Sequence, residues 1–339
     1  MAKGWQGWRL GRSRGMRPLG WGWLPWLGAL GVVAGALAWG AMDAAIAVPE
    51  VGAAGAAETL VTPWRAVVLG LVQGLTEFLP ISSTAHLKVV PVLLGWGDPG
   101  SSFTAAIQLG SIVAVLGYFR EDLLLLGRGS IAAIAGRRWR DRDLQISLGI
   151  LAGTVPIVVG GLLIKALVAD FDQSPLRSLA AIAAASIGMA LLLGAAEIVG
   201  RRDRHEADLT LADGLWIGLA QMLALVPGVS RSGSTLTAGL LLGIDRASAA
   251  RFSFLLGIPA ITLAGLVELP AVFQAGDHVS VSGAALGAGL VSALISSYAT
   301  IALLLKFLKT QSTWVFVGYR LFFGAGLLLL LAQGTLADF

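Results

Sequence analysis

The 339-residue sequence contains no cysteine. A disulfide framework and a cysteine-ligated metal site are therefore excluded. Histidine is almost as scarce, with three in the whole chain, which argues against a multi-histidine metal site. The sequence also lacks the pattern GxxxxGK[ST], and this disfavours chemistry driven by a bound nucleotide.

Charge is the next scarce property. Charged residues make up 13% of the chain and hydrophobic residues 56%, with a mean hydropathy of +0.80. Several apolar runs are long enough, at about 1.5 Å per residue, to cross a hydrocarbon core of roughly 30 Å. Because lipid cannot satisfy backbone groups and the runs lack a two-residue alternation, the sequence predicts an all-α, polytopic membrane protein rather than a barrel.

The first 60 residues differ from the rest of the chain. A basic, tryptophan-rich start is followed by an apolar run from about residue 23 to residue 48. This extension, residues 1–60, is either a cleaved signal peptide or an extra transmembrane helix, and both readings stay open. In either case its basic flank predicts a cytoplasmic start and delivery of residue 60 to the outer face. Residues 61–339 then form the membrane domain.

Within this domain, the apolar runs predict six core transmembrane helices and two broken segments. The six are near residues 102–119, 146–168, 178–199, 248–267, 283–305 and 313–333. Residues 64–95 are interrupted by "PISST" and residues 212–244 by "PGVSRSGST". Each broken segment is expected to be two half-helices joined by a loop at membrane depth, where protein or a polar cavity must surround the loop.

The positive charge lies in short loops. The net charge of +4 and a pI of about 9.8 could suggest nucleic acid, but the arginines cluster between apolar runs, which is the positive-inside pattern. The loops at 120–145 and 200–210, the turn with Arg246 and Arg251, and the turn with Lys306 and Lys309 all fall on one predicted side. We expect that side to be cytoplasmic, and we expect no nucleic-acid partner.

The two broken segments resemble each other. Both contain Gly-Leu-x-Gln, a proline six or seven residues after the glutamine, and a break rich in Ser and Thr. The predicted layout makes one enter from outside and the other from the cytoplasm. That arrangement is an inverted-topology repeat with two re-entrant helix-loop-helix segments meeting near the midplane. We expect the functional site where they meet.

In the first break, polar side chains gather near the start of a half-helix. Hydroxyl groups there lie among backbone N–H groups that lack partners, and such a helix start attracts anions. Glu77 follows Gln73 by four residues, so both project from one helix face. The candidates in this segment are Gln73, Glu77, Ser82, Ser83, Thr84 and His86. Plain helix capping is the structural alternative for the hydroxyl groups, and packing is the alternative for the histidine.

In the second break, two glycines flank an arginine among hydroxyl groups. Arg231 offers a planar fork suited to phosphate oxygens, and glycine lets the backbone approach a ligand closely. An ion pair of Arg231 with Glu77 is the structural alternative, and it is compatible with function if a ligand shares the pairing. The substrate-binding candidates in this segment are Ser230, Ser232, Gly233, Ser234 and Thr235. Together the two breaks suit phosphoryl transfer from a lipid phosphate.

At these residues the sequence resembles the undecaprenyl-diphosphate phosphatase family, also called the bacitracin-resistance BacA type. The matching segments are "QGLTEFLPISSTAH", "PGVSRSGST", "IQLGSIVAV" at 107–115, "FSFLLGIPA" at 252–260 and "YR" at 319–320. The resemblance runs from about residue 62 to the C-terminal end. Two departures from the family pattern are visible, because Gln73 takes the first acidic position and Ala85 replaces a common glycine.

The resemblance implies hydrolysis of undecaprenyl diphosphate to undecaprenyl phosphate and phosphate, which recycles the lipid carrier for peptidoglycan synthesis and gives bacitracin resistance. It also implies a divalent cation, Mg²⁺ or Ca²⁺, with Glu77 as a ligand, in a bacterial inner membrane with the site facing the periplasm. A homodimer is one option for the assembly.

Our mechanistic hypothesis is that Ser83 attacks the terminal phosphorus, Glu77 and His86 manage the protons, and Arg231 holds the diphosphate. His86 as nucleophile, or direct activation of water, stays open. The competing function is a transporter or flippase of a polyprenyl phosphate, because inverted repeats with broken helices are typical of transporters. A phosphatidic-acid-type phosphatase is disfavoured, since no histidine follows Arg231 until His278.

Overall fold

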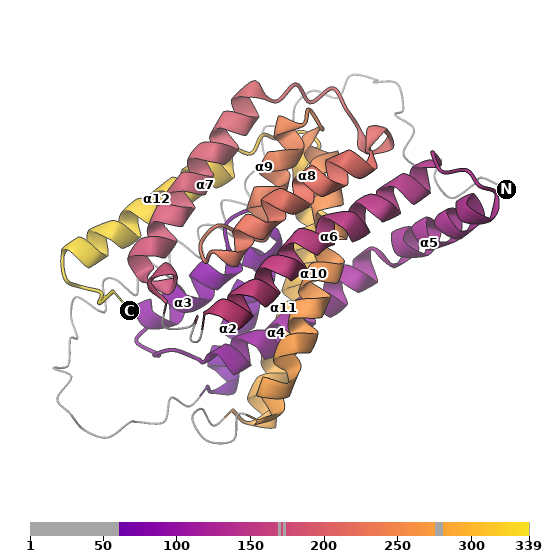
Figure 1. Cartoon of the computed structure of the whole chain (residues 1–339). Helices are drawn as coiled ribbons and strands as arrows, with labels where there is room; N and C mark the ends of the chain where they lie inside the picture. Colours follow the sequence, from indigo (N-terminus) through magenta and orange to yellow (C-terminus); the bar gives the residue numbers. More distant parts are fainter. Residues whose placement is uncertain (1–60, 169–170, 172–173, 275–280, 339) are drawn as a thin grey trace.

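The computed structural model describes residues 61–168, 171, 174–274 and 281–338. This part of the chain is helical, has no strand, and confirms the all-α prediction (Figure 1). The prediction for residues 1–60 lies outside the described residues. In chain order the helices are α2 (Pro63–Phe78), α3 (Ser83–Leu93), α4 (Ser101–Tyr118), α5 (Arg120–Ala135), α6 (Arg142–Leu167), α7 (Leu179–Val199), α8 (Leu211–Met222), α9 (Arg231–Leu241), α10 (Arg246–Gln274), α11 (Gly283–Leu308) and α12 (Trp314–Ala332).

The long apolar helices match the predicted spans. Among the described residues, five helices are long and apolar enough to cross a membrane, namely α6, α7, α10, α11 and α12. A sixth span is counted if α4 and α5, which meet at a bend of 61°, are taken together. The chain is therefore a multi-pass membrane protein, as the sequence predicts.

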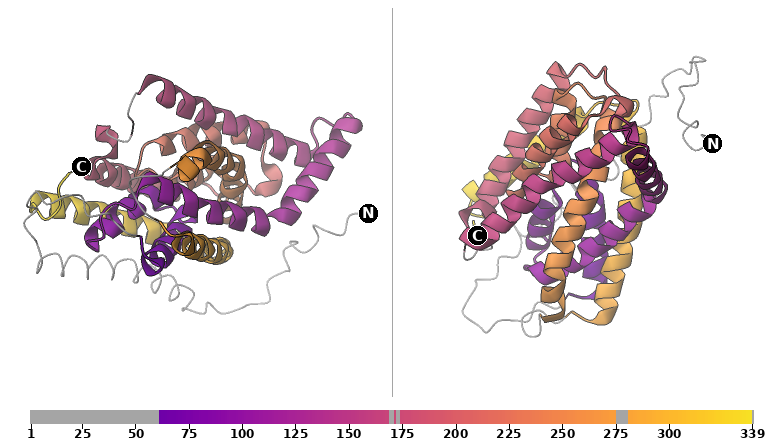
Figure 2. Two further views of the ribbon diagram at one scale, coloured as in Figure 1. Left: turned by 90° about the horizontal axis from the view of Figure 1, so that it is seen from below. Right: turned by 45° about the vertical axis from the view of Figure 1, so that its right-hand side comes forward.

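One predicted loop is wrong. Residues 120–145 were expected to be a charged loop, but Arg120–Ala135 form helix α5. The segment contains good helix formers such as leucine and alanine between its arginines, so charge alone does not prevent a helix. Ser130 of α5 donates a hydrogen bond to Ser147 of α6 (2.9 Å), and Figures 1 and 2 show these two helices side by side at one end of the molecule.

Both broken segments return to the side from which they start. Arg65, at the start of α2, lies 5.5 Å from the ring centre of Trp96, which follows α3. In the second segment the N–H of Arg204, ahead of α8, donates to the carbonyl of Gly243, just after α9 (3.0 Å). The α2–α3 and α8–α9 pairs are thus re-entrant and enter from opposite ends, which supports the inverted repeat.

Small residues allow the half-helices to pack closely on long helices. α2 crosses α11, where a Cβ on Gly70 would lie 2.4 Å from the carbonyl oxygen of Gly289. α8 crosses α6 in the same way, where a Cβ on Gly218 would lie 2.2 Å from the carbonyl oxygen of Gly153. Such contacts are typical of helix pairs in membranes. Gly70 and Gly218 are the first residues of the repeated Gly-Leu-x-Gln, so the repeat extends to the packing.

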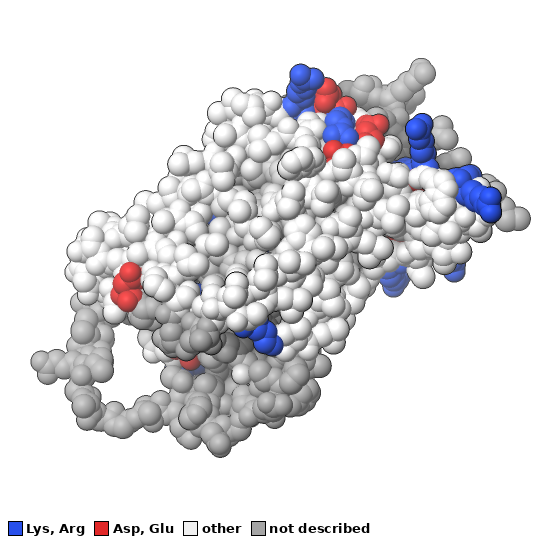
Figure 3. Space-filling model, in the orientation of Figure 1, with Lys and Arg blue, Asp and Glu red and all other residues white. Residues whose placement is uncertain are grey.

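Charged side chains from the predicted cytoplasmic loops meet at one end of the molecule. Arg251 pairs with Asp122 and Glu206, while Glu197 accepts hydrogen bonds from Arg246 and Arg202. These pairs join the inner ends of α5, α7 and α10 to the connection before α8. Figure 3 shows most of the charged residues of that face gathered at its upper right end. The loops are therefore brought together as the sequence predicts.

Candidate active site

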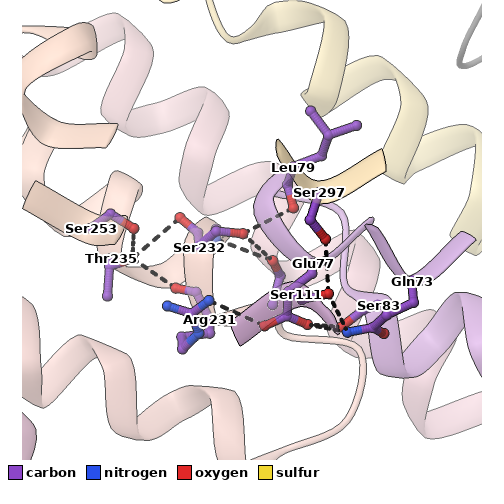
Figure 4. Close-up of polar contacts among 12 residues, drawn as sticks. Gln73, Glu77, Leu79, Ser83, Ser111, Arg231, Ser232, Thr235, Ser253 and Ser297 are labelled. Carbon is purple, nitrogen blue, oxygen red and sulfur yellow. Dashed lines mark hydrogen bonds and ion pairs between the residues drawn. The ribbon is translucent and has the colours of Figure 1, made fainter. Parts of the chain in front are cut away.

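Glu77 is the centre of the site. It lies at the end of α2, is 9% exposed, and its carboxylate meets one side chain from each break (Figure 4). Ser83 Oγ donates to Glu77 Oε2 at 2.6 Å, and Arg231 Nη2 donates to Oε1 at 3.2 Å. The side chains expected to meet from two distant segments do so here, on one carboxylate.

The same backbone conformation brings Ser83 and Arg231 to this carboxylate. Ser82 precedes α3 with φ 77° and ψ 103°, and Ser230 precedes α9 with φ 75° and ψ 117°. Residues other than glycine rarely adopt such positive φ angles, and each costs on the order of 1–3 kcal/mol. Ser83 and Arg231 are the next residues and begin their helices. They therefore occupy equivalent positions in the two repeats.

The two helix starts differ in their capping. Ser230 Oγ accepts a hydrogen bond from the N–H of Gly233 (3.1 Å) and so caps α9. Ser82 makes no such side-chain bond, so the capping alternative is not found for Ser82. The first-turn N–H groups of α3 are left without a side-chain cap beside Ser83, and an uncapped helix start favours an anion.

A cavity of about 570 Å³ opens over this centre. Of the predicted site residues, those lining it are Gln73, Glu77, Ser82, Ser83, Thr84, Ser230 and Arg231. Further lining residues were missed by the sequence reasoning, among them Lys88, Asp98, Gln108 and Arg177. Lys88 could have been found, because it follows Thr84 by one helical turn. Asp98 and Arg177 come from distant connections, and no sequence signal points to them.

The remaining residues of the second break support the loop from behind. Ser232 Oγ donates to the carbonyl of Leu79 in the first break (2.9 Å). Ser234 Oγ and Thr235 Oγ1 both donate to the carbonyl of Arg231, at 3.0 and 2.8 Å. These three side chains do not line the cavity, and neither does Gly233. Their predicted contact with substrate stays a prediction. The Ser232 contact joins the two breaks, while those of Ser234 and Thr235 lie within the second break.

His86 lies behind the first break. It is fully buried and is absent from the cavity wall, and its ring stacks on Phe323 with centroids 4.5 Å apart. Its Nδ1 lies 2.6 Å from the carbonyl of Ser82, which can only accept, so Nδ1 carries the proton. Nε2 then accepts from the hydroxyl of Tyr319 at 2.6 Å. Both ring nitrogens are thus engaged, and the predicted catalytic role of His86 stays a prediction.

Two further contacts orient the charged pair. Gln73 Nε2 donates to Glu77 Oε2 (3.3 Å) and to Ser111 Oγ (3.4 Å), which fixes the carboxylate from the α4 side. Arg231 lies against the backbone of α10 at Gly257, where an added Cβ would be 1.6 Å from Nη1. That buried Nη1 has no hydrogen-bond partner among the described residues. Nη1 is therefore enclosed by α10, while the Arg231 side chain lines the cavity and reaches Glu77 through Nη2.

The comparison with known proteins decides the family. The family model described as bacitracin resistance protein BacA matches residues 66–326, which include both breaks. The chain belongs to this family. Among the BacA relatives, a protein named undecaprenyl-diphosphatase from Synechococcus elongatus is 62% identical over 81% of this chain and 95% of the relative. One of the same name from Trichormus variabilis is 63% identical over 81% of this chain and 85% of the relative.

Proposed function

We propose that the chain hydrolyses undecaprenyl diphosphate to undecaprenyl phosphate and inorganic phosphate. Its BacA relatives carry the name of this activity and align over about four fifths of the chain. The observation that carries the proposal is the Glu77 carboxylate, which accepts from the Ser83 hydroxyl on one oxygen and from Arg231 on the other. A base, a nucleophile and a phosphate-binding cation thus meet in one cavity.

In the first step, Ser83 Oγ attacks the terminal phosphorus. Its proton passes to Glu77 Oε2, which lies 2.6 Å away. The bond between that phosphorus and the bridging oxygen breaks, and the proton is returned to the departing undecaprenyl phosphate. The products of this step are the lipid monophosphate and a phosphoserine.

In the second step, water attacks the phosphoserine. Glu77 takes a proton from the water, the bond from phosphorus to Ser83 Oγ breaks, and the proton restores the hydroxyl. Direct attack of a Glu77-activated water on the lipid diphosphate gives the same products without the intermediate. The geometry favours either route over attack by His86, because both ring nitrogens of His86 are engaged outside the cavity wall.

Arg231 and the start of α3 bind the terminal phosphate. Arg231 lines the cavity and contacts Glu77 through Nη2, and the first turn of α3 has no side-chain cap. Nη2 carries two N–H groups, so Arg231 can donate to a phosphate oxygen beside its bond to Glu77. Charge builds up on these oxygens during phosphoryl transfer, and preformed donors stabilise it without reorganisation.

The described residues contain no group of three or more His, Asp and Glu side chains that could hold a metal ion. The cavity wall still offers Glu77 and the amide oxygen of Gln73, and Mg²⁺ is commonly held by one or two carboxylates together with substrate phosphates. We propose that Mg²⁺ or Ca²⁺ is held by Glu77, Gln73 and the diphosphate. The ion would neutralise phosphate charge when bound.

We further propose that the protein lies in a bacterial inner membrane with its cavity facing the periplasm. Asp98 and Arg177, which line the cavity, belong to the α3–α4 and α6–α7 connections. Those connections lie at the opposite end from the arginine-rich cluster around Arg251 and Arg246. The positive-inside rule makes the cluster end cytoplasmic. Formation of a homodimer in the membrane stays a prediction.

Phosphate release from purified protein tests the proposed function. The wild type in detergent should release phosphate from undecaprenyl diphosphate, and Glu77→Gln and Arg231→Met should each reduce the rate strongly. Ser130→Ala, in the α5–α6 contact, is a control that should keep the wild-type rate. Binding of the lipid by the wild type without turnover would contradict the enzyme and support the transporter reading.

A further inference from the structure

Arg320 is a buried cation that no part of the mechanism above uses. It lies on α12, is 1% exposed, and donates only to backbone carbonyls. Its Nε donates to Ser186 of α7 (3.1 Å), Nη1 to Pro80 (3.0 Å) and Nη2 to Gly228 (2.7 Å). Within the described ranges, the hydrogen-bond partners of the Arg320 side chain are these three carbonyls and include no carboxylate. Burial of an unpaired charge is costly, so a buried guanidinium that binds three carbonyls is expected to have a specific role.

The two carbonyls at the Nη atoms are equivalent in the repeat. Pro80 lies two residues before Ser82, and Gly228 lies two residues before Ser230. One guanidinium therefore holds the same backbone position in both breaks. The planar fork has two matching Nη groups, which suits two matching carbonyls from an inverted pair of segments. A lysine ammonium has a single nitrogen and cannot reproduce this geometry.

The held carbonyls lie two residues before the strained residues. Ser82 and Ser230 have φ angles of 77° and 75°, and such conformations persist only where the surroundings impose them. Each is followed by a residue that reaches Glu77, namely Ser83 or Arg231. A change in the separation of the two breaks would move these side chains apart at the carboxylate.

The residue before Arg320 acts on the same break. The hydroxyl of Tyr319 bonds to Nε2 of His86, and Nδ1 of His86 donates to the carbonyl of Ser82. Two consecutive residues of α12 thus contact the first break, at Pro80 directly and at Ser82 through His86. The second break has the Arg320 contact at Gly228 as its link to α12.

We propose that Arg320 is a positioning residue for phosphoryl transfer, which fixes the distance between Ser83 and Arg231 by binding the Pro80 and Gly228 carbonyls together. Arg320 does not line the cavity, so it acts through the two breaks rather than on the substrate. This inference rests on the proposed roles of Ser83 and Arg231. It predicts that the contribution of Arg320 to the rate depends on an intact Arg231.

A double-mutant cycle tests this dependence. Arg320→Gln keeps donors at the site but loses the charge and the fork, and kcat of the folded protein should fall at least tenfold in the wild-type background. In the Arg231→Lys background, where the bidentate group is already lost, the same substitution should lower kcat less than twofold. Radiolabelled undecaprenyl diphosphate keeps the residual rates measurable, and the folded fraction is determined by size exclusion and thermal unfolding.

Arg204→Gln is the matched control. Arg204 also donates to carbonyls, those of Leu242 and Asp208, and pairs with Asp213 far from the cavity. Its loss should lower the unfolding temperature and leave kcat of the folded protein unchanged in both backgrounds. If Arg320→Gln does not fold, Arg320→Lys carries the same comparison.

The positioning role would be overturned if Arg320→Gln lowered kcat by the same factor in both backgrounds. A wild-type kcat in folded Arg320→Gln would overturn it as well. Failure of both Arg320 variants to fold would also overturn it, because Arg320 would then serve the fold alone. Absence of phosphate release by the wild type would instead contradict the proposed function. The wild-type assay measures this outcome separately from the Arg320 variants.

Discussion

Ser83 and Arg231 are equivalent residues of two inverted segments, and their side chains bind the two oxygens of one carboxylate, that of Glu77. Each begins a short helix after a serine of positive φ. The repeat has thus placed a hydroxyl in one half and a guanidinium in the other at the same backbone position. The site is asymmetric in chemistry although its backbone is symmetric.

Glu77→Gln should abolish most of the activity. The amide keeps the shape of the side chain and can still contact Ser83 and Arg231, but it cannot accept the Ser83 proton. Removal of a general base costs about 10²–10⁴-fold in rate, so kcat for phosphate release should fall within that range. An unchanged kcat in a folded Glu77→Gln protein would contradict the assignment of Glu77 as the base.

Gly257→Ala should impair binding of the diphosphate. The new Cβ would lie 1.6 Å from Arg231 Nη1, so the guanidinium must move away from its place against α10. We expect an increase in KM and a loss of kcat of at least tenfold.

Gly326→Ala on α12 is the control for Gly257→Ala, because nothing lies within 4 Å of its added Cβ. Kinetic constants near those of the wild type are expected for this variant. The same kinetic defect in both glycine variants would show that Arg231 is not the affected group.

The two serines of positive φ should respond differently to alanine. Ser230 caps α9 through the N–H of Gly233, so Ser230→Ala should lower the free energy of unfolding by about 1 kcal/mol. Ser82 has no capping bond, and Ser82→Ala should leave stability nearly unchanged. Thermal unfolding in one detergent measures both. An equal loss in the two variants would refute the difference in capping.

Gly218→Ala should weaken the contact of α8 with α6. A Cβ there would lie 2.2 Å from the carbonyl oxygen of Gly153, and overpacking of this kind costs about 1–3 kcal/mol. Gly188→Ala on α7, with open space at its Cβ, should be neutral. A thermal-unfolding temperature for Gly218→Ala equal to that of Gly188→Ala would argue against close packing of these helices.

Much of the fold could be predicted from composition and pattern. Apolar runs gave the spans, because a chain in lipid has to satisfy its backbone within helices. The repeated Gly-Leu-x-Gln and the two breaks predicted re-entrant segments, and the structure brings Glu77 to Arg231. Helix α5 could not be predicted, because its arginines resemble those of a loop and its packing on α6 depends on tertiary contacts.

The sequence could not show which candidate residues line the cavity and which face the protein interior. His86 shares a short segment with Glu77 and Ser83, yet helical rotation turns it behind the break toward Tyr319, 233 residues away in sequence. The same applies to Ser232 and Thr235, which face protein rather than the cavity. The carbonyl contacts of Arg320 could not be predicted, because "YR" at 319–320 does not reveal that Pro80 and Gly228 approach the guanidinium.

Rapid quenching of the enzyme with undecaprenyl diphosphate labelled in its terminal phosphate tests the central claim most directly. The account predicts a transient phosphoserine that maps to Ser83, that is absent in Ser83→Ala, and that accumulates at the rate of lipid monophosphate release. Label on His86, or a burst of phosphate release with no labelled protein, would contradict attack by Ser83.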